Sequence, residues 1–421
     1  MNRRQLLGAL TGAGLGLAVT TPTSHAQTVG RDPLNVWDFG ARGVDPAADT
    51  TAIEAAFSAA GRGREVYFPA LELNGGAGWY GVIRTLQRPQ GVHLVGDSPA
   101  WSNLIWAGPA GGTLMRTFGN SQGGIKNMTI AGDPAVVTGA AARIDRWPQT
   151  LLDFGTQSLV DWANGAEDVQ FAACTGDAIS MPAGWWNFWM HRIRWDAVAG
   201  YWINAFAAPG QNLSSFEVDT FTADMNPASP SKWGFRFDLT RTVAPSGPIK
   251  ICLGHIEASS GALANDQATI TMVSNPATGP QWQIKLEDLT IDRGAGVTGD
   301  YALVRHIGSP NGGQFAVSWR DVRLSWVPTS ALLVGNLPNF GNLSIPNTFD
   351  LREFVYTGEM VRHTGVNYEI DGTFQHGADP WGTSRFGVHG AQPVPQEVLP
   401  LGAPTDAVIR LLQRVGFARQ G

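Results

Sequence analysis

The chain has 421 residues, a formal net charge of −6 and 43% hydrophobic residues, which is enough to build a globular core. An acidic chain does not attract a polyanion, so we expect no nucleic-acid partner. Two cysteines are too few for a disulfide scaffold, and no histidine or cysteine cluster has metal-ligand spacing. We expect no cofactor, while a calcium ion and a pairing of Cys174 with Cys252 stay open.

The first 26 residues have the pattern of a secretory leader. Arg3 and Arg4 precede an uncharged apolar run from Leu6 to Val19, and Ala26 ends a small-residue cleavage site. The two arginines favour the twin-arginine type. The apolar run is shorter than the roughly 20 residues that a membrane-spanning helix needs. We therefore expect a signal peptide over residues 1–26, no membrane span, and a mature protein that is periplasmic or secreted.

Residues 34–69 predict a short strand, an amphipathic helix and a second strand. Asp49 or Thr50 can cap the start of the helix, apolar residues then recur at helical spacing, and Gly61 ends it. A lone helix placed before a solenoid would cover the open edge of its first coil.

Beyond residue 120 the pattern apolar-x-x-apolar-x-apolar returns repeatedly, at near-regular intervals along the chain. We take its central residues to be Met128, Val169, Ile193, Phe216, Ile256, Leu289, Val322 and Phe354. Intervals this regular indicate one solenoid. The two longest intervals, after Met128 and after Phe216, predict projecting loops near 132–160 and 222–248.

A second set of strands is expected between these repeats, because short apolar stretches lie between Gly, Pro, Asn and Asp turns. These strands are predicted over 177–181, 201–206, 234–239, 268–273, 301–306 and 331–335. The predicted fold is all-β, a right-handed parallel β-helix solenoid with a short N-terminal capping helix. It would form one domain over residues 27–400, followed over 401–421 by a helical tail that caps the stack or serves oligomerisation.

The N-terminal segment resembles the opening of the pectate-lyase-like parallel β-helix proteins, of the pectate lyase 3 or rhamnogalacturonase–epimerase type. The matching residues are Val36, Asp38, Phe39, Gly40, Ala41, Gly43, Asp49, Thr50, Ala52, Ile53, Ala56, Val66, Tyr67, Phe68 and Pro69. Where that family usually has Gly-Asp-Gly-x-x-Asp-Asp-Thr, this chain has GVDPAADT. The resemblance implies an exported carbohydrate-active protein, but the sequence lacks the signatures of polygalacturonases and of calcium-dependent pectate lyases.

Ionisable residues gather on the middle coils of the predicted solenoid. In the predicted register Asp196 lies one coil and two residues from Glu217, a separation of ~8 Å. That distance suits the acid and base of an inverting glycoside hydrolase. Glu217 and Asp219 on one strand also fit, and stacking of Asp196 over Asp219, or of Glu217 over Glu257, would raise one pKa of each pair. We predict Asp196, Glu217 and Asp219 as the catalytic candidates.

Substrate-binding candidates surround these carboxylates. Charged groups would position the sugar and two aromatic rings would stack on it. These candidates are Arg192, Arg194, His255, Glu257, Trp185 and Trp186. The structural alternative is an arginine–carboxylate ladder that only solvates the outer sheet, with the aromatic residues stacked inside the core.

Three functions stay open. The first is a glycoside hydrolase that cleaves an extracellular polysaccharide, which the two arginines suggest is acidic. The second is a polysaccharide lyase or uronate epimerase, in which Arg194 or His255 abstracts a proton and Arg192 neutralises the uronate. The third is a non-catalytic glycan-binding or surface protein. The sequence does not fix the oligomeric state.

Overall fold

In the computed structural model the chain forms a stack of β-strands within the unit Pro33–Gly421. The described residues are 32–73, 75–117, 123–155, 160–161, 165–206, 214–225, 234–240, 248–258, 268–274, 281–293, 302–308, 314–324, 333–335, 351–352, 369–374 and 384–389. The predicted signal peptide over 1–26 and helical tail over 401–421 lie outside them. Within the described ranges no helix is long and apolar enough to cross a membrane.

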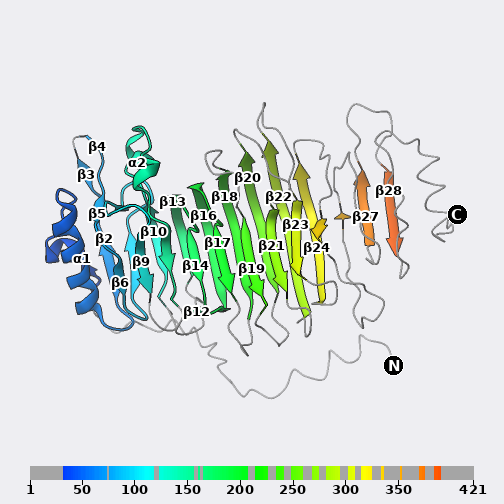
Figure 1. Ribbon diagram of the computed structural model, residues 1–421, viewed down its shortest axis with the longest axis horizontal. Helices are drawn as coiled ribbons and strands as arrows, with labels where there is room; N and C mark the ends of the chain where they lie inside the picture. The colour runs from blue at the N-terminus through cyan, green and yellow to red at the C-terminus, as the bar shows by residue number, and fades with distance from the viewer. Residues whose placement is uncertain are drawn as a thin grey trace, which may run out of the picture. The chain divides into compact units, whose positions relative to one another are not determined.

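Two parallel sheets form the stack (Figure 1). We call them the long sheet and the second sheet. The long sheet contains β1 Leu34–Asn35, β2 Glu65–Phe68, β5 Tyr80–Val82, β7 His93–Gly96, β8 Asn103–Trp106, β10 Ile125–Ala131, β13 Ala166–Cys174, β16 Phe188–Val198, β18 Phe216–Met225, β20 Ile249–Ala258, β22 Gln281–Arg293, β24 Gln314–Leu324 and β26 Leu351–Arg352. The second sheet contains β6 Leu86–Arg88, β9 Thr113–Thr117, β11 Thr150–Asp153, β14 Ile179–Met181, β17 Ile203–Phe206, β19 Phe235–Leu239, β21 Ala268–Ser274, β23 Ala302–Gly308 and β25 Leu333–Gly335.

From β9 to β26 the strands of the two sheets alternate along the chain, so each coil adds one strand to each sheet, whereas the first coils add extra strands to the long sheet. This is the predicted parallel β-helix, and all six predicted second strands are present. Three small strand pairs lie outside the two sheets. They are β3 Glu72–Leu73 with β4 Gly76–Ala77, β12 Val160–Asp161 with β15 Trp185–Trp186, and β27 Glu369–Phe374 with β28 Ser384–His389.

The N-terminal cap consists of η1 Val36–Phe39 and the helix α1 Pro46–Ala60. The helix begins earlier than predicted, because Asp45 accepts a 2.9 Å hydrogen bond from the Ala47 backbone N–H and proline suits the first helical position. Asp49, read from the sequence as a cap, is instead buried inside the helix. Its carboxylate accepts backbone N–H groups of Arg42 at 2.8 Å and Gly81 at 3.0 Å, and so joins the cap to the first coil.

The observed register differs from the predicted one in two coils. The central residues Met128, Val169 and Ile193 align as predicted, but Ile193 pairs with Phe221 and not with Phe216. Phe221 in turn pairs with Gly254, and not with Ile256. A Cβ at Gly254 would lie 2.3 Å from the Phe221 ring, so the glycine makes room for that ring in the core. The apolar pattern failed on this coil because its central core position, Gly254, carries no side chain.

The corrected central residues change the predicted loops. Register now gives the series Met128, Val169, Ile193, Phe221, Gly254, Leu289 and Val322. The long interval before Val169 does contain an excursion, with α2 Ala135–Thr138 and η2 Ile144–Arg146. The interval near 222–248 is no longer one of the longest, since the central residues on either side of it are Phe221 and Gly254. β18 continues to Met225 and β19 lies within that range, while residues 226–233 and 241–247 lie outside the described ranges.

A left-handed residue bends each strand just before the central position. The residues with positive φ in this column are Asn127, Asp168, Arg192, Thr220, Leu253 and Asp288, with φ between 50° and 54°. The bend explains why two residues, and not one, separate the first two apolar positions of the repeat. Asn and Asp tolerate this backbone best among residues with a Cβ.

Candidate functional site

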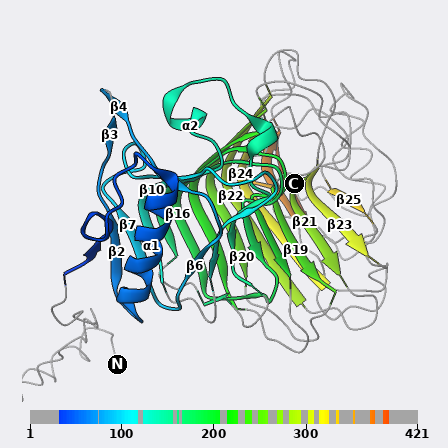
Figure 2. The same cartoon turned by 60° about the vertical axis from the view of Figure 1, so that its left-hand side comes forward.

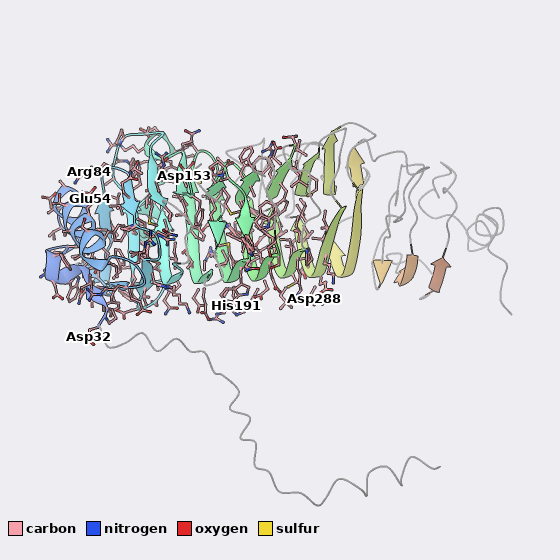
Figure 3. All side chains as sticks on the ribbon, turned by 90° about the horizontal axis from the view of Figure 1, so that it is seen from below. Asp32, Glu54, Arg84, Asp153, His191 and Asp288 are labelled. Atoms are coloured by element: carbon pink, nitrogen blue, oxygen red, sulfur yellow. The ribbon has the colours of Figure 1, made fainter. Side chains whose placement is uncertain are left out.

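Outward side chains of β13, β16, β18, β20 and β22 form the candidate site, which we call the outer face. In Figure 3, His191 and Asp288 lie along the same edge of the strands, opposite Asp153 of the second sheet. Strand register places the side chains of this face in columns. Carboxylates outnumber cationic groups among the described residues. The carboxylates are Glu167, Asp168, Asp196, Glu217, Asp219, Asp224, Glu257, Glu287, Asp288 and Asp292, and the cations are Lys126, Arg192, Arg194, Lys250 and Lys285.

One column of the outer face is a row of carboxylates on four successive coils. Asp224, Glu257 and Asp292 are in register, and Asp196 and Asp224 directly follow the paired residues Trp195 and Ala223. We call these four residues the acid column. Adjacent members are separated by about one strand spacing, ~4.8 Å.

Arg194 links the first two members of the acid column. One nitrogen, Nη2, lies 3.2 Å from Asp196 Oδ2 and 3.6 Å from Asp224 Oδ2. The two carboxylate oxygens are therefore no farther apart than the sum of these two distances. Burial raises the pKa of Asp196, Arg194 lowers it in part, and the charge of Asp224 raises it further. The Asp196 carboxyl is thus easier to protonate than an ordinary aspartate.

Apolar residues occupy the same column on the preceding coils. Ala172 is in register with Asp196, and Ala131 is in register with Ala172. Both alanines are fully buried in a small cluster with Ile105, and Trp79 and Val136 pack against this cluster. Asp196 therefore borders a covered apolar patch, which accounts for its partial desolvation.

At the far end of the acid column, His255 Nε2 lies 2.8 Å from Asp292 Oδ2. Glu257, which lies between Asp224 and Asp292 in the column, makes no hydrogen bond or ion pair with another described residue. Both His255 and Glu257 face outward, as predicted. They lie beside Asp224 and Asp292, and Glu257 is not stacked on Glu217 as the predicted register required.

The other two predicted catalytic residues lie elsewhere on the outer face. Glu217 pairs in register with Trp189, and Asp219 with His191. These positions are seven and five residues before Asp196, so the predicted separation of ~8 Å between Asp196 and Glu217 was wrong. Glu217 instead forms a 2.8 Å ion pair with Lys250. Glu217 and Asp219 do lie on one strand, two residues apart and both facing outward.

Asp219 belongs to a separate cluster that the sequence analysis missed. Its carboxylate contacts Nδ1 of His191, and the His191 ring stacks on Trp189 with centroids 5.9 Å apart. The carboxylate orients the imidazole, as in other histidine–carboxylate pairs.

Of the predicted substrate-binding residues, Arg192 and Trp185 have structural contacts, whereas Trp186 is exposed. Arg192 binds Asp168 through two hydrogen bonds of 2.5 Å and Glu167 through one of 2.7 Å. It therefore matches the arginine–carboxylate ladder more closely than a free binding group. Trp185 is fully buried, so its prediction as a sugar platform was wrong. Trp186 is 51% exposed and stays available for stacking.

Asp224 is the most important residue that the sequence analysis missed. With Phe216 taken as the central residue, the predicted column passed through Asp219 and ended before residue 224. The segment Val218-Phe221-Ala223 carries the same apolar spacing and would have revealed it. Within the described ranges no group of three His, Cys, Asp or Glu could hold a metal ion. Cys174 and Cys252 are both free thiols.

No protein-family model and no curated protein matches the chain. Among solved structures it is similar to ORF18 of Geobacillus virus E2, with 12% identity and a TM-score of 0.51 over 85% of this chain and 64% of that one. It thus spans less than two thirds of that chain. A GH87 α-1,3-glucanase catalytic unit from Streptomyces thermodiastaticus has 16% identity and a TM-score of 0.39, over 86% of this chain and 69% of that one. The Azotobacter vinelandii mannuronan C-5 epimerase AlgE6 A-module has 14% identity and a TM-score of 0.38, over 82% and 97%. At 12% identity the similarity to ORF18 supports the parallel β-helix fold alone.

Proposed function

We propose that this protein is an exported glycoside hydrolase that cleaves a polysaccharide bound along the acid column. The N-terminal resemblance to pectate-lyase-like proteins favours a glycan, and a row of outward carboxylates on four successive coils suits an extended chain. The observation that carries the proposal is the pair Asp196 and Asp224. One carboxyl has a raised pKa, and a single Arg194 nitrogen, 3.2 Å from one and 3.6 Å from the other, holds the two together.

The chemistry assigns different roles to the two carboxyl groups. Asp196 is the general acid that protonates the leaving oxygen, because it is the group whose pKa is raised. Asp224 is the more exposed of the two and is the nucleophile. Retaining hydrolases need carboxyl groups roughly 5–5.5 Å apart, a separation that the shared contact with Arg194 allows. Arg194 contacts both groups and would hold them in place until substrate enters.

A neutral glycan fits the outer face better than the acidic one suggested by the sequence. The expectation of an acidic substrate rested on Arg192 and Arg194, and both are already paired with carboxylates. A polyanion would also meet an excess of negative charge on this face.

The test is reducing-end release from a panel of soluble polysaccharides. Dextran, arabinoxylan, galactomannan and hydroxyethyl cellulose are the neutral members, and alginate and polygalacturonate the acidic ones. Asp196→Asn and Asp224→Asn should each lower the rate on the cleaved glycan by about 10²–10⁴-fold. Asp288→Asn is the matched control, because Asp288 is exposed on the same face at a left-handed position that Asn also tolerates. Equal activity in Asp196→Asn and the control would refute the assignment.

The His191–Asp219 pair favours a second candidate function, a polysaccharide lyase or uronate epimerase. A histidine oriented by a carboxylate can abstract the proton beside a uronate carboxyl. Elimination gives an unsaturated product that absorbs in the near ultraviolet, whereas hydrolysis does not. Such absorbance on alginate or polygalacturonate, lost in Asp219→Asn and kept in Asp196→Asn, would favour this function.

A further inference from the structure

We infer that the loop over residues 132–149 blocks one end of the acid column and makes the enzyme act from a chain end. This inference rests on the proposed hydrolase function and adds a mode of attack to it. We call residues 132–149 the end loop. Figures 1 and 2 show its helix α2 standing out from the strands near β10.

The end loop covers the column on the coils that precede Asp196. Val136 of α2, together with Trp79 from outside the loop, packs against the cluster of Ile105, Ala131 and Ala172, and the two alanines have no exposed surface. A glycan lying along the column cannot continue past Ala172 without displacing these contacts. On the other side of Asp196, the side chains of Asp224 and Asp292 are 41% and 39% exposed, and Glu257 between them is partly exposed.

Asp133 holds the end loop in place. Its carboxylate is 4% exposed and accepts hydrogen bonds from the Ala135 N–H at 2.8 Å, the Arg143 N–H at 2.6 Å and Trp147 Nε1 at 2.8 Å. One buried carboxylate thus ties both ends of the excursion together. The loop is also bound to the coil beneath it, because the Gly132 N–H donates to the Ala172 carbonyl at 2.9 Å.

Close packing leaves the base of the end loop little freedom to swing away. A Cβ at Gly132 would lie 1.9 Å from the Ala173 carbonyl oxygen and 2.4 Å from Pro148 Cδ. Backbone and proline ring therefore meet here without intervening space, and Trp147 is buried beside them. The end loop behaves as a fixed wall.

The position of the wall determines where a chain can be cut. Only one coil, ~4.8 Å, separates covered Ala172 from the proposed acid Asp196, which leaves room for about one sugar ring. Asp224, Glu257 and Asp292 extend along the open side and would bind the rest of the chain. A substrate therefore enters with its end against the wall, and each cut releases a short product.

The experiment compares product patterns on the panel polysaccharide that the native protein cleaves fastest. Viscosity and the size distribution of products are followed against reducing ends released. The shortened variant replaces residues 135–142 with two glycines. This link of about 10 Å reach is long enough, because one carboxylate binds the N–H groups of both Ala135 and Arg143. Asp145→Asn, an exposed change in the same loop, is the control.

The native protein and the control should release small products from the start while viscosity stays nearly constant. The shortened variant should give fragments of intermediate size and a faster loss of viscosity for the same number of cuts. If the shortened variant does not fold, as judged by thermal unfolding, Asp133→Asn replaces it and should shift the pattern in the same direction. Rapid loss of viscosity with the native protein, or an unchanged product pattern in a folded loop variant, overturns this inference and leaves the proposed hydrolase function standing. No cleavage of any panel member overturns the proposed function and the inference with it.

Discussion

Ala172 and Asp196 occupy the same outward position on adjacent coils, yet one is fully buried under the end loop and the other is the first carboxylate outside it. This boundary gives Asp196 its two distinguishing properties. It is partly desolvated by its apolar neighbours, and it begins a row of carboxylates that continues through Asp224, Glu257 and Asp292.

Removing the Asp196 charge should stabilise the protein at neutral pH. The folded-state pKa of Asp196 is raised, so the folded protein binds this proton more tightly than the unfolded chain. The carboxyl therefore costs no stability below the unfolded pKa and becomes destabilising as pH rises through the folded pKa. Asp196→Asn should raise the melting temperature at pH 7 relative to native protein, by more than it does at pH 3. An equal change at both pH values would contradict this account.

Arg194 should set the alkaline limit of activity. The guanidinium lowers the pKa of Asp196, so Arg194→Gln should raise that pKa and keep the acid protonated to higher pH. The alkaline limb of the kcat/KM profile should then move upward. Arg192→Gln is the control, since Arg192 binds Asp168 and Glu167 and has no ion pair with Asp196. A limb that stays in place in Arg194→Gln, or moves equally in both variants, would count against Asp196 as the acid.

The cap should depend more on Asp49 than on the residue that begins the helix. Asp49→Ala removes acceptors from three backbone N–H groups at a buried site and should cost about 3 kcal/mol or more. Asp45→Ala removes one exposed N-cap bond and should cost about 1 kcal/mol. Denaturant unfolding measures both, and an equal loss in the two variants would show that the buried bonds have no special role.

The two adjacent tryptophans should behave oppositely. Trp185 packs edge-on against Phe216 and Phe237, so Trp185→Ala should destabilise the fold by about 3–5 kcal/mol. Trp186 is half exposed, and Trp186→Ala should change stability by less than about 0.5 kcal/mol. If Trp186 stacks on sugar, its variant should raise KM without changing kcat. An unchanged KM would remove it from the substrate-binding set.

The sequence predicted the architecture because stacked coils repeat one local requirement, an apolar side chain at fixed positions. Val169 and Ile193 follow that rule, so their coils were aligned correctly. Gly254 breaks the rule, because its missing side chain is compensated by the Phe221 ring of the preceding coil, and no local pattern shows such compensation. A separate error, the choice of Phe216 in place of Phe221 as the central residue of the preceding coil, moved the predicted column from Asp224 to Asp219, although Val218-Phe221-Ala223 carries the apolar spacing. The proposed catalytic pair was therefore predicted only in part, with Asp196 identified and Asp224 missed.

The local sequence pattern also could not predict that Trp185 is buried. Trp185 follows a Pro-Ala-Gly turn, which favours an exposed loop, but its indole N–H donates to the Ser214 carbonyl and its ring enters the core. The start of the cap helix, by contrast, could have been predicted from local sequence. Asp45 and Pro46 carry a local start signal, whereas the prediction placed the cap at Asp49 or Thr50.

The anomeric configuration of the first product tests the central claim most directly. Proton NMR during early hydrolysis of the cleaved panel glycan reports whether the new reducing end has the configuration of the original linkage. Because one nitrogen of Arg194 contacts both Asp196 and Asp224, at 3.2 Å and 3.6 Å, we predict retention by way of a covalent intermediate on Asp224. Inversion would contradict the assignment of Asp224 as nucleophile, and an unsaturated sugar in place of a new reducing end of either configuration would contradict hydrolysis itself.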